Sequence, residues 1–130
     1  MTKMKTLSLS LFCLLTMLFF LSCDTNKKLD QDNAVKAIKQ FLSSSRGEVG
    51  VEAIGSIEPV SQFSVTEASS IVHFNYLNPY ATGNLVLKFK FQKNMDKKWI
   101  LTSLEVVEGA GLQRIHDWVR KNQNINIVAQ

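Results

Sequence analysis

The sequence predicts an α+β domain in which an N-terminal helix packs on a four-stranded antiparallel meander sheet, with a short C-terminal helix. Three observations predict this order. Apolar residues recur at helical spacing in residues 30–47, alternate with polar residues in stretches between positions 70 and 109, and return to helical spacing in residues 112–122. A meander sheet covered on one face by helices is a two-layer α+β arrangement.

The first expected helix has a clear apolar face. Val35, Ile38 and Leu42 share this face at amphipathic spacing. Asp30 or Asp32 is suited to cap the helix start, where the helix dipole favours a negative charge. We expect this helix to cover the sheet.

Residues 49–65 are rich in β-forming types but are interrupted by Gly55 and Pro59. Proline lacks an N–H for the ladder, so this stretch predicts an edge strand or two short pieces. Residues 70–77 alternate cleanly and predict a strand, and the composition of residues 78–84 predicts a turn or loop.

Residues 83–109 predict a β-hairpin, which is the strongest local pattern in the chain. With the turn centred on Met95-Asp96, the antiparallel register places Phe91 opposite Ile100 and Leu87 opposite Leu104. This register puts one set of apolar residues on a single face: Leu85, Leu87, Phe89, Phe91, Ile100, Leu104 and Val106.

The same register leaves Val86, Trp99 and Leu101 on the opposite face of the hairpin. Such a face is less polar than a solvated one, and exposed apolar patches mark interaction sites. These three residues are therefore the predicted partner-facing residues, unless the C-terminal helix covers them. That helix is expected over residues 112–122, followed by a tail that either pairs with the sheet or extends freely.

The first 22 residues have the features of a secretory leader. Two lysines and no acidic residue precede an uncharged stretch from Leu7 to Leu21. This stretch is shorter than the roughly 20 residues that span a bilayer as a helix. A signal peptide is therefore favoured over a permanent transmembrane anchor.

The residues before Cys23 are Phe20, Leu21 and Ser22. This segment resembles the lipobox of bacterial lipoproteins, in which small residues precede a cysteine that is acylated on its sulfur after cleavage. The resemblance implies that Phe20, Leu21 and Ser22 are recognised by the signal peptidase and that Cys23 carries lipid. It places the chain in the cell envelope, anchored to the inner or the outer membrane.

We accordingly divide the chain into a signal peptide (1–22), a lipidated cysteine with a polar tether (23–31) and a single domain (32–130). Anchoring by more than one acyl chain agrees with the weak binding that a single chain provides. Removal of the leader also removes Cys13, so Cys23 is the only cysteine left and no intramolecular disulfide forms.

Charge predicts no nucleic-acid partner. Without the leader, 13 basic and 11 acidic residues remain, a net charge of +2, and the basic residues are spread along the chain. The two histidines, His73 and His116, lie on different predicted elements and match no metal-binding motif. No nucleophile or phosphate-binding motif is present either. We predict no catalytic residue, no metal and no cofactor.

The order of elements is similar to that of cystatin-like and NTF2-like folds, but no motif accompanies it. We therefore predict a non-catalytic binding module for an envelope protein or a small ligand, lipid-anchored through Cys23. Two alternatives remain open. One is a small enzyme with an NTF2-like, cone-shaped pocket between helix and sheet, and the other is an envelope inhibitor or immunity-type protein.

Overall fold

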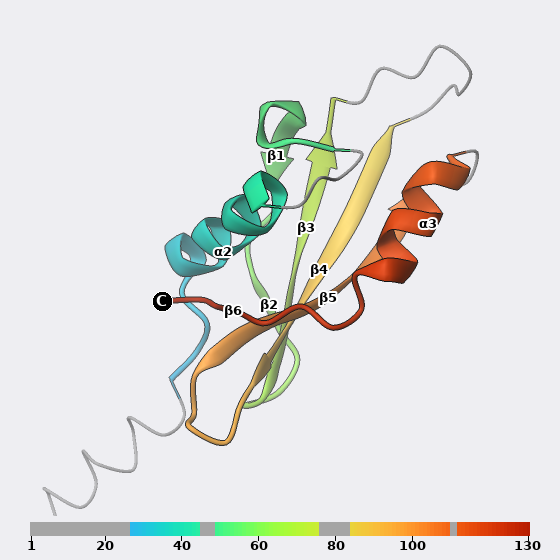
Figure 1. The fold of residues 1–130 in the computed structure, drawn as a ribbon. Coiled ribbons are helices and arrows are strands. Elements are labelled where there is room, and N and C mark those ends of the chain that lie inside the picture. The colour runs from blue at the N-terminus through green and yellow to red at the C-terminus, as the bar shows by residue number, and fades with distance from the viewer. Residues whose placement is uncertain (1–26, 45–48, 76–83, 110–111) are drawn as a thin grey trace, which may run out of the picture.

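The computed structural model describes residues 27–44, 49–75, 84–109 and 112–130. In these residues a curled antiparallel sheet carries two helices, which confirms the predicted α+β class (Figure 1). The elements in chain order are α2 (Gln31–Ser44), the 3-10 turn η1 (Val51–Ala53), β1 (Ile54–Ile57), β2 (Ser61–Gln62), β3 (Glu67–Phe74), β4 (Leu85–Lys93), β5 (Trp99–Glu108), α3 (Gln113–Lys121) and β6 (Ile127–Val128).

The sheet contains six strands within the described residues, two more than predicted. Its order is β1-β3-β4-β5-β6, and β2 also pairs with β3. The additional strands come from the two segments that the sequence left open. Residues 49–65 form two short strands, β1 and β2, on either side of Pro59, and the C-terminal tail adds β6 to the edge of β5.

The turn between β4 and β5 is one residue longer than predicted. The Asn94 N–H donates to the Lys98 carbonyl at 2.9 Å, and the Lys98 N–H donates to Asn94 Oδ1, also at 2.9 Å. Between them Lys97 adopts a left-handed conformation with φ of 60°. Trp99 therefore pairs with Lys93, and the register at the tip differs from the predicted one.

A one-residue change of register would turn the rest of β5 inside out, because side chains alternate between the two faces. A β-bulge at Thr102 prevents this. Phe91 pairs with Leu101 and Lys90 with Ser103, so Thr102 is the extra residue, and its hydroxyl donates to the Lys90 carbonyl at 3.2 Å. Trp99 and Leu101 consequently lie on the core side before the bulge, and Leu104 lies there after it.

Both helices pack on this core face. In α2, Ala34, Ala37, Ile38, Phe41 and Leu42 are buried, and in α3, Ile115, Trp118 and Val119 are buried. The Phe41 ring meets Phe89 of β4 edge-on, with centroids 6.1 Å apart, and stacks on Trp118 at 5.8 Å. The two helices and the sheet thus share one core, and among the described residues the opposite face of the sheet carries no helix (Figure 1).

Candidate functional site

Cys23, the predicted site of lipidation, lies outside the described residues, as do Phe20, Leu21 and Ser22. What the structure does describe is the chain that follows. The Lys27 carbonyl accepts hydrogen bonds from the Trp99 indole at 3.1 Å and from Lys93 Nζ at 2.9 Å, and Leu29 is buried in the core. The second half of the predicted tether is therefore packed against the β4–β5 hairpin.

The predicted partner-facing residues do not form an exposed patch. Trp99 and Leu101 are only 6% and 0% exposed because the longer turn shifts the register of β5 before the Thr102 bulge and places both residues on the core side. Val86 alternates with the core residues Leu85 and Leu87, yet it is only 3% exposed. We therefore do not place a partner surface on these three residues.

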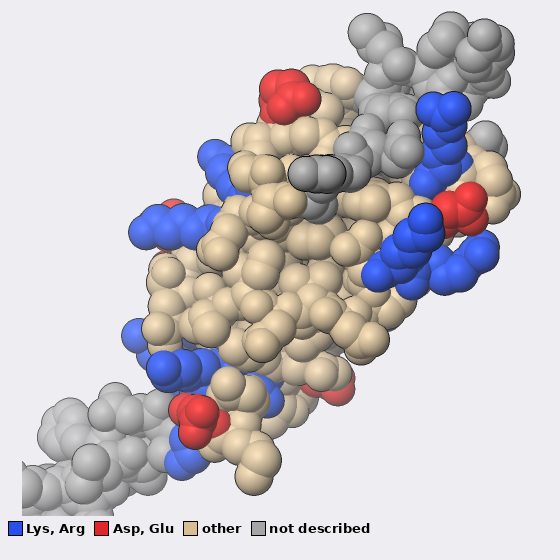
Figure 2. Space-filling view, viewed as in Figure 1, with Lys and Arg blue, Asp and Glu red and all other residues tan. Residues whose placement is uncertain are grey.

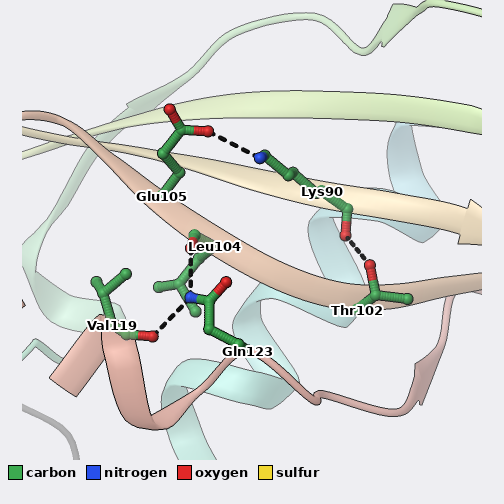
Figure 3. Close-up of polar contacts among 6 residues, drawn as sticks. All are labelled: Lys90, Thr102, Leu104, Glu105, Val119 and Gln123. Atoms are coloured by element: carbon green, nitrogen blue, oxygen red, sulfur yellow. Dashed lines mark hydrogen bonds and ion pairs between the residues drawn. The ribbon is translucent and has the colours of Figure 1, made fainter.

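The face of the sheet opposite the helices is largely polar. Its central strands present Lys88, Lys90 and Gln92 from β4 and Ser103 and Glu105 from β5, which alternate with the buried residues of the core face. Lys90 Nζ lies 2.9 Å from Glu105 Oε2, with about half of each side chain exposed (Figure 3). We call this surface the open face.

A hollow of about 250 Å³ lies on the open face. Its lining includes Phe63, Lys88 and Lys90, with Glu67 and Ser69 from β3. Phe63 is 63% exposed, and Lys88 Nζ lies 5.8 Å from the centre of its ring. A cation over an aromatic ring is a favourable contact, and both groups remain available to a further partner.

Electrostatics on this face are dominated by the Lys90–Glu105 pair. The hydrogen bond from Lys90 and its positive charge lower the pKa of the Glu105 carboxyl, and Lys88 adds to this effect, while slight desolvation opposes it. Glu105 is therefore a stable anion that partly offsets the two lysines. Glu67 also lines the hollow, so the two lysines are balanced by two carboxylates, and the hollow combines an exposed aromatic ring with charges of both signs.

The histidines are not brought together. His73 Nε2 lies 2.9 Å from Glu58 Oε2 in an exposed pair at the edge of the sheet, and His116 lies on α3. Within the residues that the structure describes, no group of His, Cys, Asp and Glu side chains is placed to hold a metal ion. Nor is any described helix long and apolar enough to cross a membrane.

A second hollow, of about 460 Å³, lies beside the bulge and is lined mainly by amides and hydroxyls. One of these amides has a structural role. Gln123 Nε2 donates to the Val119 carbonyl at 2.7 Å and to the Leu104 carbonyl at 2.9 Å, which ties the end of α3 to β5 (Figure 3). The hollow is therefore shaped by a residue that holds the fold together.

Five lysines gather at the hairpin end of the molecule. Around a small hollow lie Lys27 and Lys28 from the start of the described chain, Lys93 from β4, and Lys97 and Lys98 from the turn. Lys and Arg side chains, drawn in blue, are visible at this end of the molecule (Figure 2). We call these five residues the lysine end.

The lysine end corrects the interpretation of the sequence that the basic residues are spread along the chain, because five of them are close together in the structure. It is assembled from two segments separated by about 65 positions, which only the docking of residues 27–29 on the hairpin brings together. Phe63 and Lys88 were missed for the same reason, since β2 and β4 both pair with β3. The only signal in the sequence was the number of lysines around the predicted turn.

No protein-family model, curated protein or solved structure matches the chain.

Proposed function

We propose that the chain is a lipid-anchored bacterial envelope protein whose single α+β domain is a non-catalytic binding module. The observation that carries the anchor is the position of Cys23, directly after an apolar leader and six residues before Leu29, the first described core residue. A short spacing of this kind suits a domain held close to the membrane by the acyl chains of its first residue.

The anchor is tested by the chemistry of the mature N-terminus. We expect mass spectrometry of the membrane-extracted protein to find an acylated Cys23 as the first residue. The Cys23→Ala variant should accumulate as unprocessed or unanchored chain, because the acylated sulfur is lost. Membrane extraction behaviour that is unchanged in Cys23→Ala would contradict a lipoprotein.

The open face supports the binding role. Both helices cover the other face, and the space between α2 and the sheet is filled by Phe41, Phe89 and Trp118. The hollow at Phe63 and Lys88 offers an exposed aromatic ring beside a lysine ammonium, which fits a partner segment that presents an apolar side chain next to a carboxylate. We propose this hollow as the centre of the binding surface.

The binding surface is tested by crosslinking in the native envelope, followed by purification of the anchored protein. Phe63→Ser combined with Lys88→Gln should abolish a discrete crosslinked species, since the variant removes both the ring and the charge. The matched control is Lys36→Gln with Lys39→Gln on the exposed side of α2, which should retain it. A species that persists in the first variant and disappears in the control would refute this surface.

A further inference from the structure

The lysine end lies where the chain leaves the folded domain. Lys27 is held to the hairpin by two hydrogen bonds to its carbonyl, at 2.9 Å and 3.1 Å, and Lys93 Nζ also lies 5.3 Å from the centre of the Trp99 ring. The exit point of the tether is therefore fixed against the β4–β5 hairpin. Lys27 cannot move away from the turn without breaking these contacts.

The distance from this point to the predicted anchor is short. Cys23 precedes Lys27 by four residues, and an extended chain spans at most about 3.5 Å per residue, or roughly 14 Å in all. If Cys23 carries acyl chains in a bilayer, the hairpin end is held beside the headgroups. At physiological ionic strength, charges remain felt over about 8 Å.

Charge at this end is strongly asymmetric. Five lysines are opposed by Asp30 within the same hollow and by Asp96 in the turn, which leaves a local charge of about +3. The whole mature chain has a net charge of only +2. The local positive charge at the end from which the tether emerges thus exceeds that of the whole mature chain.

An independent feature of the same turn points to a lipid surface. Met95 is 99% exposed at the tip of the hairpin, next to Asp96 and Lys97. An apolar side chain with a lysine two residues away on either side, here Lys93 and Lys97, is suited to the boundary between headgroups and acyl chains, where the apolar part is buried and the ammonium groups stay in the polar layer.

We propose that Lys27, Lys28, Lys93, Lys97 and Lys98, with Met95 at the tip, form a binding surface for anionic phospholipid headgroups. The surface orients the domain with its hairpin end on the membrane and directs α3 and the far end of the sheet away from it (Figure 1). This inference rests on the proposed anchoring through Cys23 and adds a defined orientation to it.

The test uses the mature acylated protein, reconstituted in vesicles of phosphatidylcholine alone or with about one third phosphatidylglycerol. A polarity-sensitive fluorophore is attached at position 95 through Met95→Cys. We expect roughly twofold brighter, blue-shifted emission with phosphatidylglycerol, and loss of that gain in about 0.5 M salt, which screens surface charge. Equal emission in both vesicles would overturn the proposal.

Matched variants separate this surface from net charge. Lys97→Gln with Lys98→Gln should remove the gain in emission, whereas Arg120→Gln with Lys121→Gln on α3 makes the same change of charge and should preserve it. A gain that is lost equally in both variants would assign the effect to the whole protein and overturn the proposal.

Failure of the anchor is distinguishable from failure of the surface. Mass spectrometry of the same preparation reports acylation, and flotation with phosphatidylcholine vesicles reports anchoring. If Cys23 is not acylated, the chain is tested by sedimentation with the anionic vesicles, where the Lys97/Lys98 variant should lower the partition coefficient by roughly tenfold or more. Absence of binding to anionic vesicles, or no such loss in the variant, would overturn the lysine surface.

Discussion

Leu101 illustrates how a single side chain decides between two descriptions of the hairpin. In a regular ladder with the shorter turn it would face away from the helices, but in the structure it is fully buried in the shared core. The two arrangements predict very different energetic costs for shortening the side chain. The position is therefore a direct test of the longer turn and of the register that it sets.

We expect Leu101→Ala to lower the free energy of unfolding by about 2–5 kcal/mol, because it removes buried methyl groups and leaves a cavity. Val107→Ala on the same strand is the matched control, since Val107 is exposed and should change stability by less than about 0.5 kcal/mol. Chemical denaturation followed by circular dichroism measures both. Equal and small effects would contradict the observed register.

The Lys90–Glu105 pair has a predictable dependence on pH. Because the pKa of Glu105 is lowered in the folded state, the pair stabilises the fold fully above the pKa that the carboxyl has in the unfolded chain. This contribution is lost as the pH falls through the folded pKa. Since both side chains are about half exposed, the contribution is at most about 1 kcal/mol.

We expect Lys90→Gln to raise the Glu105 pKa, because both the hydrogen bond and the nearest positive charge are removed. An NMR titration of the carboxyl carbons measures this directly. Lys36→Gln on α2 is the control and should leave Glu105 unchanged. An unaltered Glu105 titration in Lys90→Gln would show that the pair does not form in solution.

At the level of elements, the sequence predicted what depends on local periodicity. Both helices lie within one to three residues of the expected ends, and the core face of β4 is the predicted one. The division of residues 49–65 into two short strands around Pro59 was one of the two expected outcomes. These features follow from side-chain spacing along one segment, which is visible without knowledge of the partner strand.

The features that could not be predicted depend on contacts between segments. The register of the hairpin differs from the predicted one because Lys97 adopts a left-handed conformation and Thr102 forms a bulge. Neither residue type indicates such a role in the sequence. The two candidate surfaces were missed in the sequence for a related reason. Phe63 and Lys88, or Lys27 and Lys98, become neighbours only through pairing and docking.

The hairpin turn supplies a prediction of its own. Lys97 has φ of 60°, a conformation that costs an L-residue with a Cβ atom roughly 1 kcal/mol and costs glycine little. We expect Lys97→Gly to raise the free energy of unfolding by about 0.5–1 kcal/mol, measured by denaturant titration.

Lys98→Gly is the control for this substitution, since it removes the same charge from the next residue without a positive φ. It should be neutral or destabilising, because glycine adds only freedom to the unfolded chain there. If both variants shifted stability in the same direction and by the same amount, charge rather than backbone conformation would explain the effect.

At the scale of the whole molecule, one core connects the two ends of the domain. Trp99 lies at the hairpin end and Trp118 in α3, yet both belong to the same cluster of buried side chains, linked through Phe41 and the sheet. A domain of this size with a single core is expected to unfold in one cooperative step. The two tryptophans, which are the only ones in the chain, therefore provide separate reporters of a single event.

We expect Trp118→Phe, which leaves Trp99 as the reporter, and Trp99→Phe, which leaves Trp118, each to show coincident unfolding by fluorescence and by circular dichroism. The midpoints of the two variants should differ. Trp99→Phe loses the hydrogen bond to the Lys27 carbonyl, a loss of about 0.5–1.5 kcal/mol, whereas the Trp118 indole has no hydrogen-bond partner among the described residues. If Trp99 fluorescence changed well before circular dichroism, the hairpin end would unfold separately, and the tether would not be held rigidly against the domain.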